Sequence, residues 1–498
     1  MTTAPHATTP GEAEFADIQG LVRFGHGQLA ASAFLLLTIR DQAAARAWLA
    51  AAPVTPAVAV APKPESALQV AFSAPGLAAL GLAEDVIAQF SPEFLAGMAS
   101  DSNRSRRLGD TGANDPANWR WGRQPPHLLL MLYTSPQHLD PLLAATLDEQ
   151  FLAAFAVERQ LLSRHNRTRE PFGFEDGISQ PQVDWQRALA VDGRGRDAFD
   201  NRIALGEVLL GYPNEYGLYT ARPLVAGNDG WLPGAEDQPG YMDLGRNGSY
   251  LVFRQLGQNV GGFWRFLDRG AGGDPQRREQ LAAAMVGRRR DGTPLATPSA
   301  AAIPGIDPGA GNNQFTFDGD PGGLSCPLGA HVRRANPRTG DYPAGVTGAV
   351  TRLLRTLGFC RRHHGDDLVA ATRFHRLLRR GRIYGPELPL DEALVEASAD
   401  TVERGLHFIC LGANISRQFE FVQNAWIASP KFAGLTAESD PLLGSREPLV
   451  NGDATGGFSL PRAGAPATRV DDLPRFVTVE GGGYFFMPGL RALKYMVS

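Results

Sequence analysis

Two adjacent carboxylates lie in the stretch Pro171-Phe-Gly-Phe-Glu-Asp-Gly-Ile-Ser-Gln-Pro181, where Glu175 and Asp176 stand between two glycines. Two phenylalanines alternate around them. Glycine relaxes the backbone and aromatic side chains favour burial, so we expect at least one acid to face an apolar environment. An acid fixed in such a place is suited to proton transfer.

A histidine followed by a cluster of arginines is the second candidate for chemistry. The segment Cys326-Pro-Leu-Gly-Ala-His-Val-Arg-Arg-Ala-Asn-Pro-Arg338 surrounds His331 with small residues that would let a bulky group approach. A single imidazole with nearby guanidinium groups suits a haem, because the imidazole can bind iron while the cations pair with the propionates. The segment alone fits equally well a hydrogen-bonded core histidine beside a phosphate- or surface-facing arginine cluster.

The third segment is Leu377-Leu-Arg-Arg-Gly-Arg-Ile-Tyr-Gly-Pro-Glu387. We expect an apolar helix end to deliver Arg379 and Arg380 into a glycine turn, where one guanidinium could point inward. Basic residues at helix C-termini are also common without a catalytic role, because they complement the helix dipole. Alone, this segment therefore indicates little.

Together and in this order, the three segments resemble the dye-decolourising peroxidases, which are haem peroxidases marked by a Gly-x-x-Asp-Gly motif. Supporting similarity runs through further segments, so the resemblance covers nearly the whole chain. These segments are Asp17-Ile-Gln-Gly20, Met285-Val-Gly-Arg288, Arg417-Gln-Phe-Glu-Phe-Val-Gln423 and Tyr484-Phe-Phe-Met-Pro-Gly-Leu490. The short motif alone is unspecific, and the histidine and arginine segments that follow it make the match specific.

Carried over residue by residue, the resemblance assigns three central roles. The family's distal acid falls on Asp176 rather than Glu175, because an aspartate directly precedes the second glycine. The axial ligand of the haem iron falls on His331. The distal arginine falls on Arg379, the first of the Arg-Arg-Gly triplet.

The resemblance also implies contacts around the haem. Asp440, in Glu438-Ser-Asp-Pro-Leu-Leu-Gly444, resembles the proximal carboxylate that hydrogen-bonds the axial imidazole. An Asp-Pro pair in a loop is otherwise an ordinary turn starter. The other residues expected at the haem or its distal cavity are Arg338 as a propionate partner, Leu406 and Phe408 as apolar lining on one strand face, and Phe174 and Gly177.

The function that the resemblance implies is reduction of hydrogen peroxide to water by a haem b enzyme, with one-electron oxidation of an aromatic or dye-like donor. Asp176 would shuttle a proton between the peroxide oxygens, and Arg379 would stabilise charge on the leaving oxygen. Two alternatives stay open: haem or iron metabolism with incidental peroxidase activity, and a haem-binding carrier or sensor without turnover. An intact pair of Asp176 and Arg379 argues against a carrier, which needs no proton shuttle.

Composition excludes several other classes. The chain has 498 residues and a formal net charge of −4, which gives no argument for nucleic acid or an anionic membrane as partner. Its longest clean apolar run, Phe34-Leu-Leu-Leu37, is too short to span a bilayer. The 3 cysteines favour a reducing compartment. Because the first basic residue is Arg23, we expect no export signal and a cytoplasmic protein. A homo-oligomer stays open.

Alternating strands and helices are expected to position these residues. Apolar periodicity predicts the following elements. They are strands at 32–39, 68–73 and 128–133 with helices at 42–51 and 138–162, then strands at 248–253, 406–411, 476–479 and 483–487 with helices at 260–285 and 416–426.

The fold that the resemblance implies is α+β, with two ferredoxin-like modules whose antiparallel sheets form a dimeric α+β barrel-like arrangement. We place the haem mainly in the C-terminal module. The predicted boundaries are a flexible tail 1–16, an N-terminal module 17–182 that carries Asp176, connecting loops 183–247, and a C-terminal module 248–498. Residues 339–376 form an insertion longer than the family pattern suggests, and its basic, amphipathic character predicts an effect on donor access.

Overall fold

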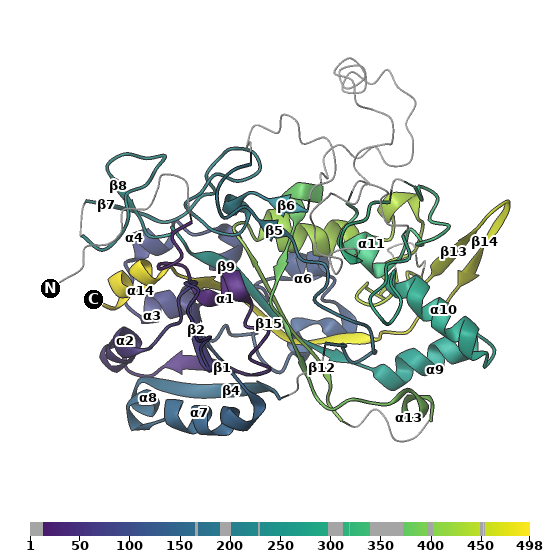
Figure 1. Cartoon of the computed structure of the whole chain (residues 1–498), viewed down its shortest axis with the longest axis horizontal. Helices are drawn as coiled ribbons and strands as arrows, with labels where there is room; N and C mark the ends of the chain where they lie inside the picture. Colours follow the sequence, from purple (N-terminus) through teal and green to yellow (C-terminus); the bar gives the residue numbers. More distant parts are fainter. Residues whose placement is uncertain are drawn as a thin grey trace, which may run out of the picture.

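The centre of the protein is a nine-stranded sheet in the order β10-β12-β9-β15-β2-β3-β1-β4, with β11 also paired to β12. The computed structural model describes residues 13–164, 168–189, 201–227, 230–296, 312–317, 319–338, 372–395, 402–448, 452 and 454–498. Each pairing between these strands is antiparallel. Helices flank the sheet on either side in Figure 1, with α7 and α8 below the first strands and α9 and α10 beside the last ones.

The N-terminal half of the sheet has the strand order β2-β3-β1-β4, with helices after β1 and β3. This order and connectivity are those of a ferredoxin-like module. Its elements are β1 (Ala31–Ile39), α2 (Gln42–Ala51), β2 (Ser66–Phe72), β3 (Leu128–Thr134), α7 (Leu139–Thr146), α8 (Glu149–Ala154) and β4 (Phe155–Ser163). Short helices fill the connection from β2 to β3: α3 (Ala74–Ala79), α4 (Glu84–Ile87), α5 (Pro92–Ala96) and α6 (Ser102–Leu108).

The C-terminal half repeats the arrangement, in the order β15-β9-β12-β10. Its elements are β9 (Ser249–Gln258), α9 (Val260–Gly270), α10 (Pro275–Val286), α11 (His331–Ala335), η6 (Thr372–His375), β10 (Leu378–Arg379), β11 (Arg382–Tyr384), α13 (Leu390–Leu394), β12 (Gly405–Gly412), the π-helical turns η7 (Ser416–Glu420) and η8 (Val422–Ala428), β15 (Val477–Met487) and α14 (Leu490–Val497). The predicted pair of ferredoxin-like modules is therefore confirmed. No helix in the described part of the chain is both long and apolar enough to cross a bilayer.

Both modules contribute to two large apolar cores. Their sheets meet where Phe486 of β15 pairs with Phe72 of β2. Phe34 of β1 packs against Phe253 of β9, and its ring also lies 5.3 Å from that of His407 on β12. A second apolar core lies between the sheets and their helices. Because β1 is buried on both faces, its sequence is a nearly continuous apolar run rather than an alternation of apolar and polar residues.

Most predicted elements are present, and two predicted helices are wrong. The helix expected at 138–162 ends early, and Phe155–Ser163 forms β4, which pairs with β1 along its length. Tertiary pairing overrides the local helical spacing there. The helix expected at 260–285 is two helices, α9 and α10. Gly272 and Gly273 adopt positive φ between them, and Asp274 caps α10 by accepting from the N–H groups of its first turn.

Two further predictions need correction. The strands expected at 476–479 and 483–487 are one strand, β15, with a register shift between Val479 and Gly481. A Cβ at Gly481 would stand 2.4 Å from Nε1 of Trp121, so glycine lets the strand pass the indole without a break. Arg379 lies in the strand β10 rather than at a helix end, because Leu378 and Arg379 pair with Leu411 and Cys410 of β12.

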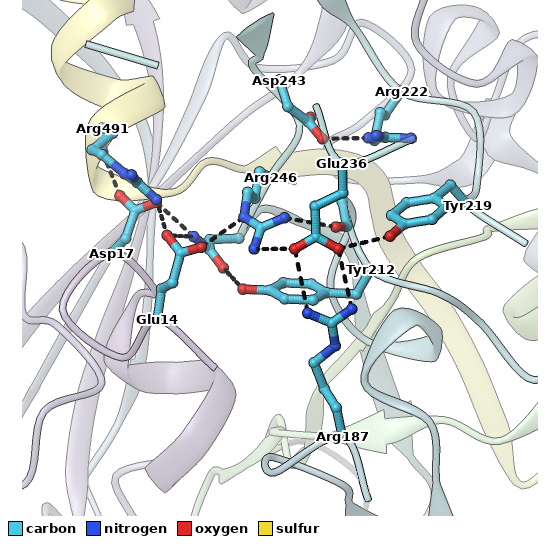
Figure 2. A network of polar contacts seen from close by, with 12 residues as sticks. Glu14, Asp17, Arg187, Tyr212, Tyr219, Arg222, Glu236, Asp243, Arg246 and Arg491 are labelled. Carbon is cyan, nitrogen blue, oxygen red and sulfur yellow. Dashed lines mark hydrogen bonds and ion pairs between the residues drawn. The ribbon is translucent and has the colours of Figure 1, made fainter. Parts of the chain in front are cut away.

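The region 183–247 consists, where described, mainly of loops with the short strands β5 (Gln182–Val183), β6 (Arg202–Ile203), β7 (Leu224–Ala226) and β8 (Tyr241–Asp243). A polar network fastens these loops to both ends of the chain (Figure 2). Arg246 lies at its centre, 2.7 Å from Glu14 and 2.8 Å from Glu236. Glu14 also pairs with Arg491 of α14. Since Ala13 is buried as well, the packed part of the protein includes residues that we assigned to the tail.

Removing one carboxylate of this network should weaken the fold. Burial raises the pKa of Glu236, but Tyr219, Arg246 and Arg187 lower it more, from 4.5 to about 2. The carboxylate therefore stabilises the folded state above pH 4.5, and this contribution is lost as the pH falls towards 2. We expect Glu236→Gln to lower the free energy of unfolding at pH 7 by about 1–2 kcal/mol, measured by denaturant unfolding.

The pH dependence separates this effect from a general packing defect. The difference between wild type and Glu236→Gln should shrink as the pH falls below 4.5, the usual pKa of this side chain. Glu84→Gln, on the exposed side of α4, is the control and should change little. A deficit of equal size at pH 7 and pH 3 would show that charge is not the cause.

Candidate active site

One cavity brings together the residues that the sequence analysis singled out from three distant segments. Its lining includes Asp176, Arg379 and His331. Most of the remaining lining is apolar. It includes Phe172, Phe174, Ile178, Leu256, Val286, Val332, Leu377, Leu406, Phe408, Phe419, Val422, Trp426, Ile427, Leu442, Leu443 and Val477. The cavity is thus a largely apolar site with a few polar groups, as expected of a cofactor site.

Asp176 and Arg379 form an ion pair in this cavity. Nη1 of Arg379 donates to Oδ1 of Asp176 at 3.2 Å. About a third of each side chain is accessible, 32% for Arg379 and 37% for Asp176, so both can meet a small molecule in the cavity. A carboxylate beside a guanidinium can accept a proton while the cation stabilises nearby negative charge.

The Asp176 loop, residues 168–181, is tied to the strand of Arg379. Oε1 of Gln180 accepts the backbone N–H of Arg379 at 3.0 Å. Gly177 has φ +77, a conformation that favours glycine, and its N–H donates to Oδ1 of Asp176 at 2.6 Å. This turn chemistry is local, whereas the contact with β10 is made only in the folded chain. A Cβ at Gly177 would meet nothing within 4 Å, so its contact with a haem stays a prediction.

His331 begins the short helix α11, and its imidazole is held by Asp440. The distance from Nδ1 of His331 to Oδ2 of Asp440 is 3.0 Å. Oδ1 of Asp440 accepts the N–H groups of Leu442 at 2.9 Å and Leu443 at 2.8 Å. Asp440 therefore starts a turn and also contacts the imidazole. With Nδ1 engaged, Nε2 of His331 is the nitrogen left for a ligand in the cavity.

The two groups shift each other's pKa in opposite directions. Burial lowers the pKa of His331, but the charge and hydrogen bond of Asp440 raise it more, so the net shift is upward. Burial raises the pKa of Asp440, but His331 and Arg334 lower it more, so the net shift is downward. The carboxylate is therefore ionised beside the imidazole at neutral pH, which makes the imidazole a more basic ligand.

Gly329, two residues before His331, packs closely against other parts of the protein. A Cβ at Gly329 would stand 3.3 Å from the ring of Phe458 on β13 (Phe458–Arg462), which pairs with β14 (Ala465–Val470). The expectation that small residues around His331 let a bulky group approach stays a prediction. The space for a ligand lies in the cavity.

Arginines gather on one side of the cavity. Arg288 lines it, is 4% exposed, and has a buried Nη2 without a hydrogen-bond partner in the described residues. Burial lowers the pKa of Arg338 well below its usual value, and the charges of Arg376 and Arg288 lower it further. Arg338 itself donates to the carbonyl groups of Asn313 and Phe315, so its role as a propionate partner stays a prediction.

These residues fit a haem. A macrocycle with an apolar body needs apolar walls, its iron needs an imidazole, and its propionates need cations. The cavity has apolar walls that include Leu406 and Phe408 and an imidazole fixed by Asp440. It also has Nη2 of Arg288, a buried donor without a partner in the part of the chain that the structure describes. Among the described residues, no three His, Cys, Asp or Glu side chains gather as a metal site.

Sequence reasoning missed several residues of this cavity. His375 lines it from η6, and Trp426 lines it from η8. Gln180, which is outside the lining but accepts the backbone N–H of Arg379, was given no role in the sequence analysis. Glu170, directly before that segment, lines the cavity together with Gln258 of β9. Only the position of Glu170 beside the acidic segment offered a signal.

Part of the predicted insertion belongs to this site. Residues 339–371 lie outside the described residues. The remaining residues, 372–376, include His375 and Arg376, both of which line the cavity. Residues 372–376 therefore belong to the cavity, and the prediction of an effect on donor access alone is limited to residues 339–371.

Comparison with known proteins identifies the class. The chain is 30% identical to a dye-decolorizing peroxidase of Exidia glandulosa, over 96% of this chain and 86% of that protein. It is 28% identical to the dye-decolorizing peroxidase msp1 of Mycetinis scorodonius, over 99% and 90% of the two chains. No family model matches the sequence.

The fold agrees with a solved structure. The crystal structure of a fungal DyP-type peroxidase from Auricularia auricula-judae superimposes with a TM-score of 0.72 at 25% identity, covering 99% of this chain and 100% of that one. The protein is a haem peroxidase, an oxidoreductase that acts on peroxide and on dye-like substrates. It belongs to the dye-decolorizing peroxidase family.

Proposed function

We propose that the cavity holds haem b, with His331 as the axial ligand of the iron and with Asp176 and Arg379 as the groups that act on hydrogen peroxide. One observation carries this proposal: a single apolar cavity is lined both by the imidazole that Asp440 fixes and by the ion pair of Asp176 and Arg379. Arg288 and Arg338 would bind the propionates. The haem would lie mainly against the C-terminal module, which supplies His331, β10 and β12.

The haem supplies the iron at which peroxide is reduced. Asp176 takes the proton from one oxygen of hydrogen peroxide and returns it to the other oxygen, which leaves as water. Arg379 donates a hydrogen bond and stabilises the negative charge that develops on the leaving oxygen. Two electrons and two protons complete the reduction to two molecules of water. Asp440 holds the imidazole of His331 in one orientation and increases its basicity.

The electrons are proposed to come from an aromatic reductant, such as a phenol or a dye, in one-electron steps. The apolar walls of the cavity and the names of the relatives support this substrate class. A cytoplasmic location remains part of the proposal and rests on the sequence alone.

An absorption experiment tests the cofactor and the activity separately. The protein reconstituted with haem b should show a Soret band, and one equivalent of hydrogen peroxide should shift it within seconds. Addition of a phenol or an anthraquinone dye should restore the starting spectrum while the donor is oxidised. Failure to bind haem would refute the cofactor proposal. A Soret band that does not respond to peroxide would support a carrier instead.

Asp440→Asn tests the hydrogen bond to the axial imidazole. Asparagine keeps the shape and can still accept the N–H groups of Leu442 and Leu443 through its oxygen, but it removes the negative charge next to His331. The imidazole then donates less charge to iron, so we expect the Fe(III)/Fe(II) potential to rise while haem stays bound. Spectroelectrochemical titration measures the change.

Glu438→Gln is the matched control. Glu438 is also buried, but its carboxylate accepts from Ser459 and pairs with Arg469 rather than with His331. We expect its potential to match the wild type. Equal potentials for wild type and Asp440→Asn would leave Asp440 only its role in the turn.

A further inference from the structure

Glu170 makes an unusual set of contacts at the start of the Asp176 loop. Oε2 of its carboxylate accepts the backbone N–H of Phe172 at 3.0 Å, and Oε1 accepts that of Phe174 at 3.0 Å. Nε2 of Gln258, at the end of β9, donates to Oε2 at 2.7 Å. One side chain therefore holds two backbone groups of the loop and joins the loop to the central sheet.

The backbone of the same residue closes the turn. The N–H of Glu170 donates to the carbonyl of Phe174 at 2.9 Å, and the N–H of Gly173 donates to the carbonyl of Glu170 at 2.7 Å. Asp176 lies two residues after Phe174, and its own N–H donates to the carbonyl of Thr168 at 2.9 Å. The position of the Asp176 carboxylate thus depends on a turn whose interior acceptors belong to Glu170.

Other contacts hold the outside of the loop. Nε1 of Trp264 on α9 donates to the carbonyl of Phe172 at 3.2 Å. Nε of Arg290 lies 3.5 Å from the carbonyl of Gly173. These two contacts engage carbonyl groups, whereas in the described part of the chain the side-chain acceptor for the N–H groups of Phe172 and Phe174 is Glu170. Loss of its carboxylate would leave a buried donor unsatisfied, which costs more than loss of an exposed contact.

We propose that Glu170 is a positioning residue for the peroxide reaction: its carboxylate fixes the turn that aims Asp176 at Arg379 and at the peroxide. This inference rests on the proposed role of Asp176. Glu170 takes no proton from peroxide and acts only through the loop. Glutamine at this position has one acceptor oxygen and a donor amide, so it can satisfy only one of the two backbone N–H groups.

A double-mutant cycle separates positioning from general stability. Glu170→Gln should slow the peroxide-dependent shift of the Soret band roughly tenfold or more, as expected for an unsatisfied donor and a displaced acid. In the Asp176→Asn background the same change should slow it less than twofold, because the group that Glu170 positions is already absent. The haem content of both variants should equal that of wild type.

The outcomes are distinct for the two proposals. If Asp176→Asn alone leaves the rate unchanged, the proposed function of Asp176 is wrong. If Asp176→Asn slows the reaction and Glu170→Gln slows it equally in both backgrounds, Glu170 does not act through Asp176 and the inference is overturned. The control is Glu279→Gln on α10, whose carboxylate lies 3.4 Å from Arg290 outside the loop, and it should react like wild type.

Hydrogen exchange gives a readout that does not depend on activity. In the full chain with haem bound and no peroxide, the amides of the peptide 171–176 should lose protection roughly tenfold in Glu170→Gln. The peptide that contains β12 should exchange as in wild type. Unchanged protection of 171–176 would show that the turn does not need the carboxylate and would refute the inference.

The protection should also depend on pH. Burial raises the pKa of Glu170 from 4.5 to about 7; Phe174, Gln258 and Phe172 lower it by hydrogen bonds, and the charge of Asp176 raises it. The ionised form, with all its acceptors, is therefore present above pH 7 and is lost as the pH falls below 7. The other charged groups near this loop are Arg169 and Glu175 within it, Arg288 and Arg290 after α10, and Arg379 on β10. The closed loop therefore binds the proton of Glu170 more tightly than the opened loop, in which the carboxyl has its usual pKa of 4.5. Wild-type protection factors should fall as the pH rises from 4.5 to 7, whereas those of Glu170→Gln should show no such fall. Parallel profiles would contradict the assignment.

Discussion

Replacing His331 with alanine should give a folded protein that has lost most of its haem. The structure supports this because Asp440 occupies Nδ1 of His331 and leaves Nε2 for the iron. With His331 as the proposed axial ligand, the iron–nitrogen bond would be the main link between the haem iron and the chain, and the remaining apolar and arginine contacts would hold the macrocycle only weakly. Haem content per chain, measured by the pyridine haemochrome spectrum after purification, gives the result.

A second histidine in the cavity provides the matched control. His375 also lines the cavity, but its Nδ1 contacts the carbonyl of Arg417 and its ring stacks on Phe421 at a centroid distance of 3.6 Å. Burial lowers the pKa of His375 to about 4, so it is neutral at pH 7. His375→Ala should keep its haem. Full haem occupancy and an unchanged spectrum in His331→Ala would identify a different axial ligand.

The second large effect concerns the pair that faces peroxide. Arg379→Leu removes a donor that stabilises developing charge, and such a loss typically lowers a rate by roughly 10²–10³. Asp176→Asn removes the acid–base group and should lower the rate by roughly 10²–10⁴. Stopped-flow measurement of the Soret shift against peroxide concentration gives both values. Because the two side chains share a 3.2 Å contact, the double variant should lose less than the product of the two factors.

The comparison between the two variants decides which residue dominates. If Asp176→Asn reacts at the wild-type rate while Arg379→Leu does not, Asp176 serves only to place water or to control access. Arg289→Leu, an exposed arginine after α10, controls for the loss of a positive charge near the site and should leave the rate unchanged. A tenfold loss in Arg289→Leu would show that overall charge, rather than Arg379 in particular, governs the reaction.

Local sequence determined much of the scaffold. The strands 32–39, 68–73, 128–133 and 406–411 were predictable because they are apolar runs of strand length, and all four lie in the central sheet. The helix 42–51 was predictable because an aspartate cap precedes an alanine-rich segment. These features depend on neighbours in the chain, so they can be recognised without the fold.

Part of the chemistry of the site could also be predicted from the sequence. The residues Asp176, His331, Arg379 and Asp440 lie in short segments that resemble a known family, and the structure brings all four to one cavity or its wall. Their order along the chain made the family recognisable. The distances between these residues could not be predicted, because segments more than a hundred residues apart come together only when the central sheet forms.

Only the tertiary structure decided the rest. Residues 155–163 have helical spacing but form β4, since pairing with β1 satisfies their backbone groups in the sheet. Arg379 became a strand residue because β12 offers it a partner, and Gln180 fastens its N–H to the Asp176 loop. Glu170 looks like one more surface acid in the sequence. Folding buries its carboxylate among N–H groups from its own loop and from Gln258 of β9. No local sequence pattern encodes this environment, which is the basis of the positioning role that we propose for Glu170.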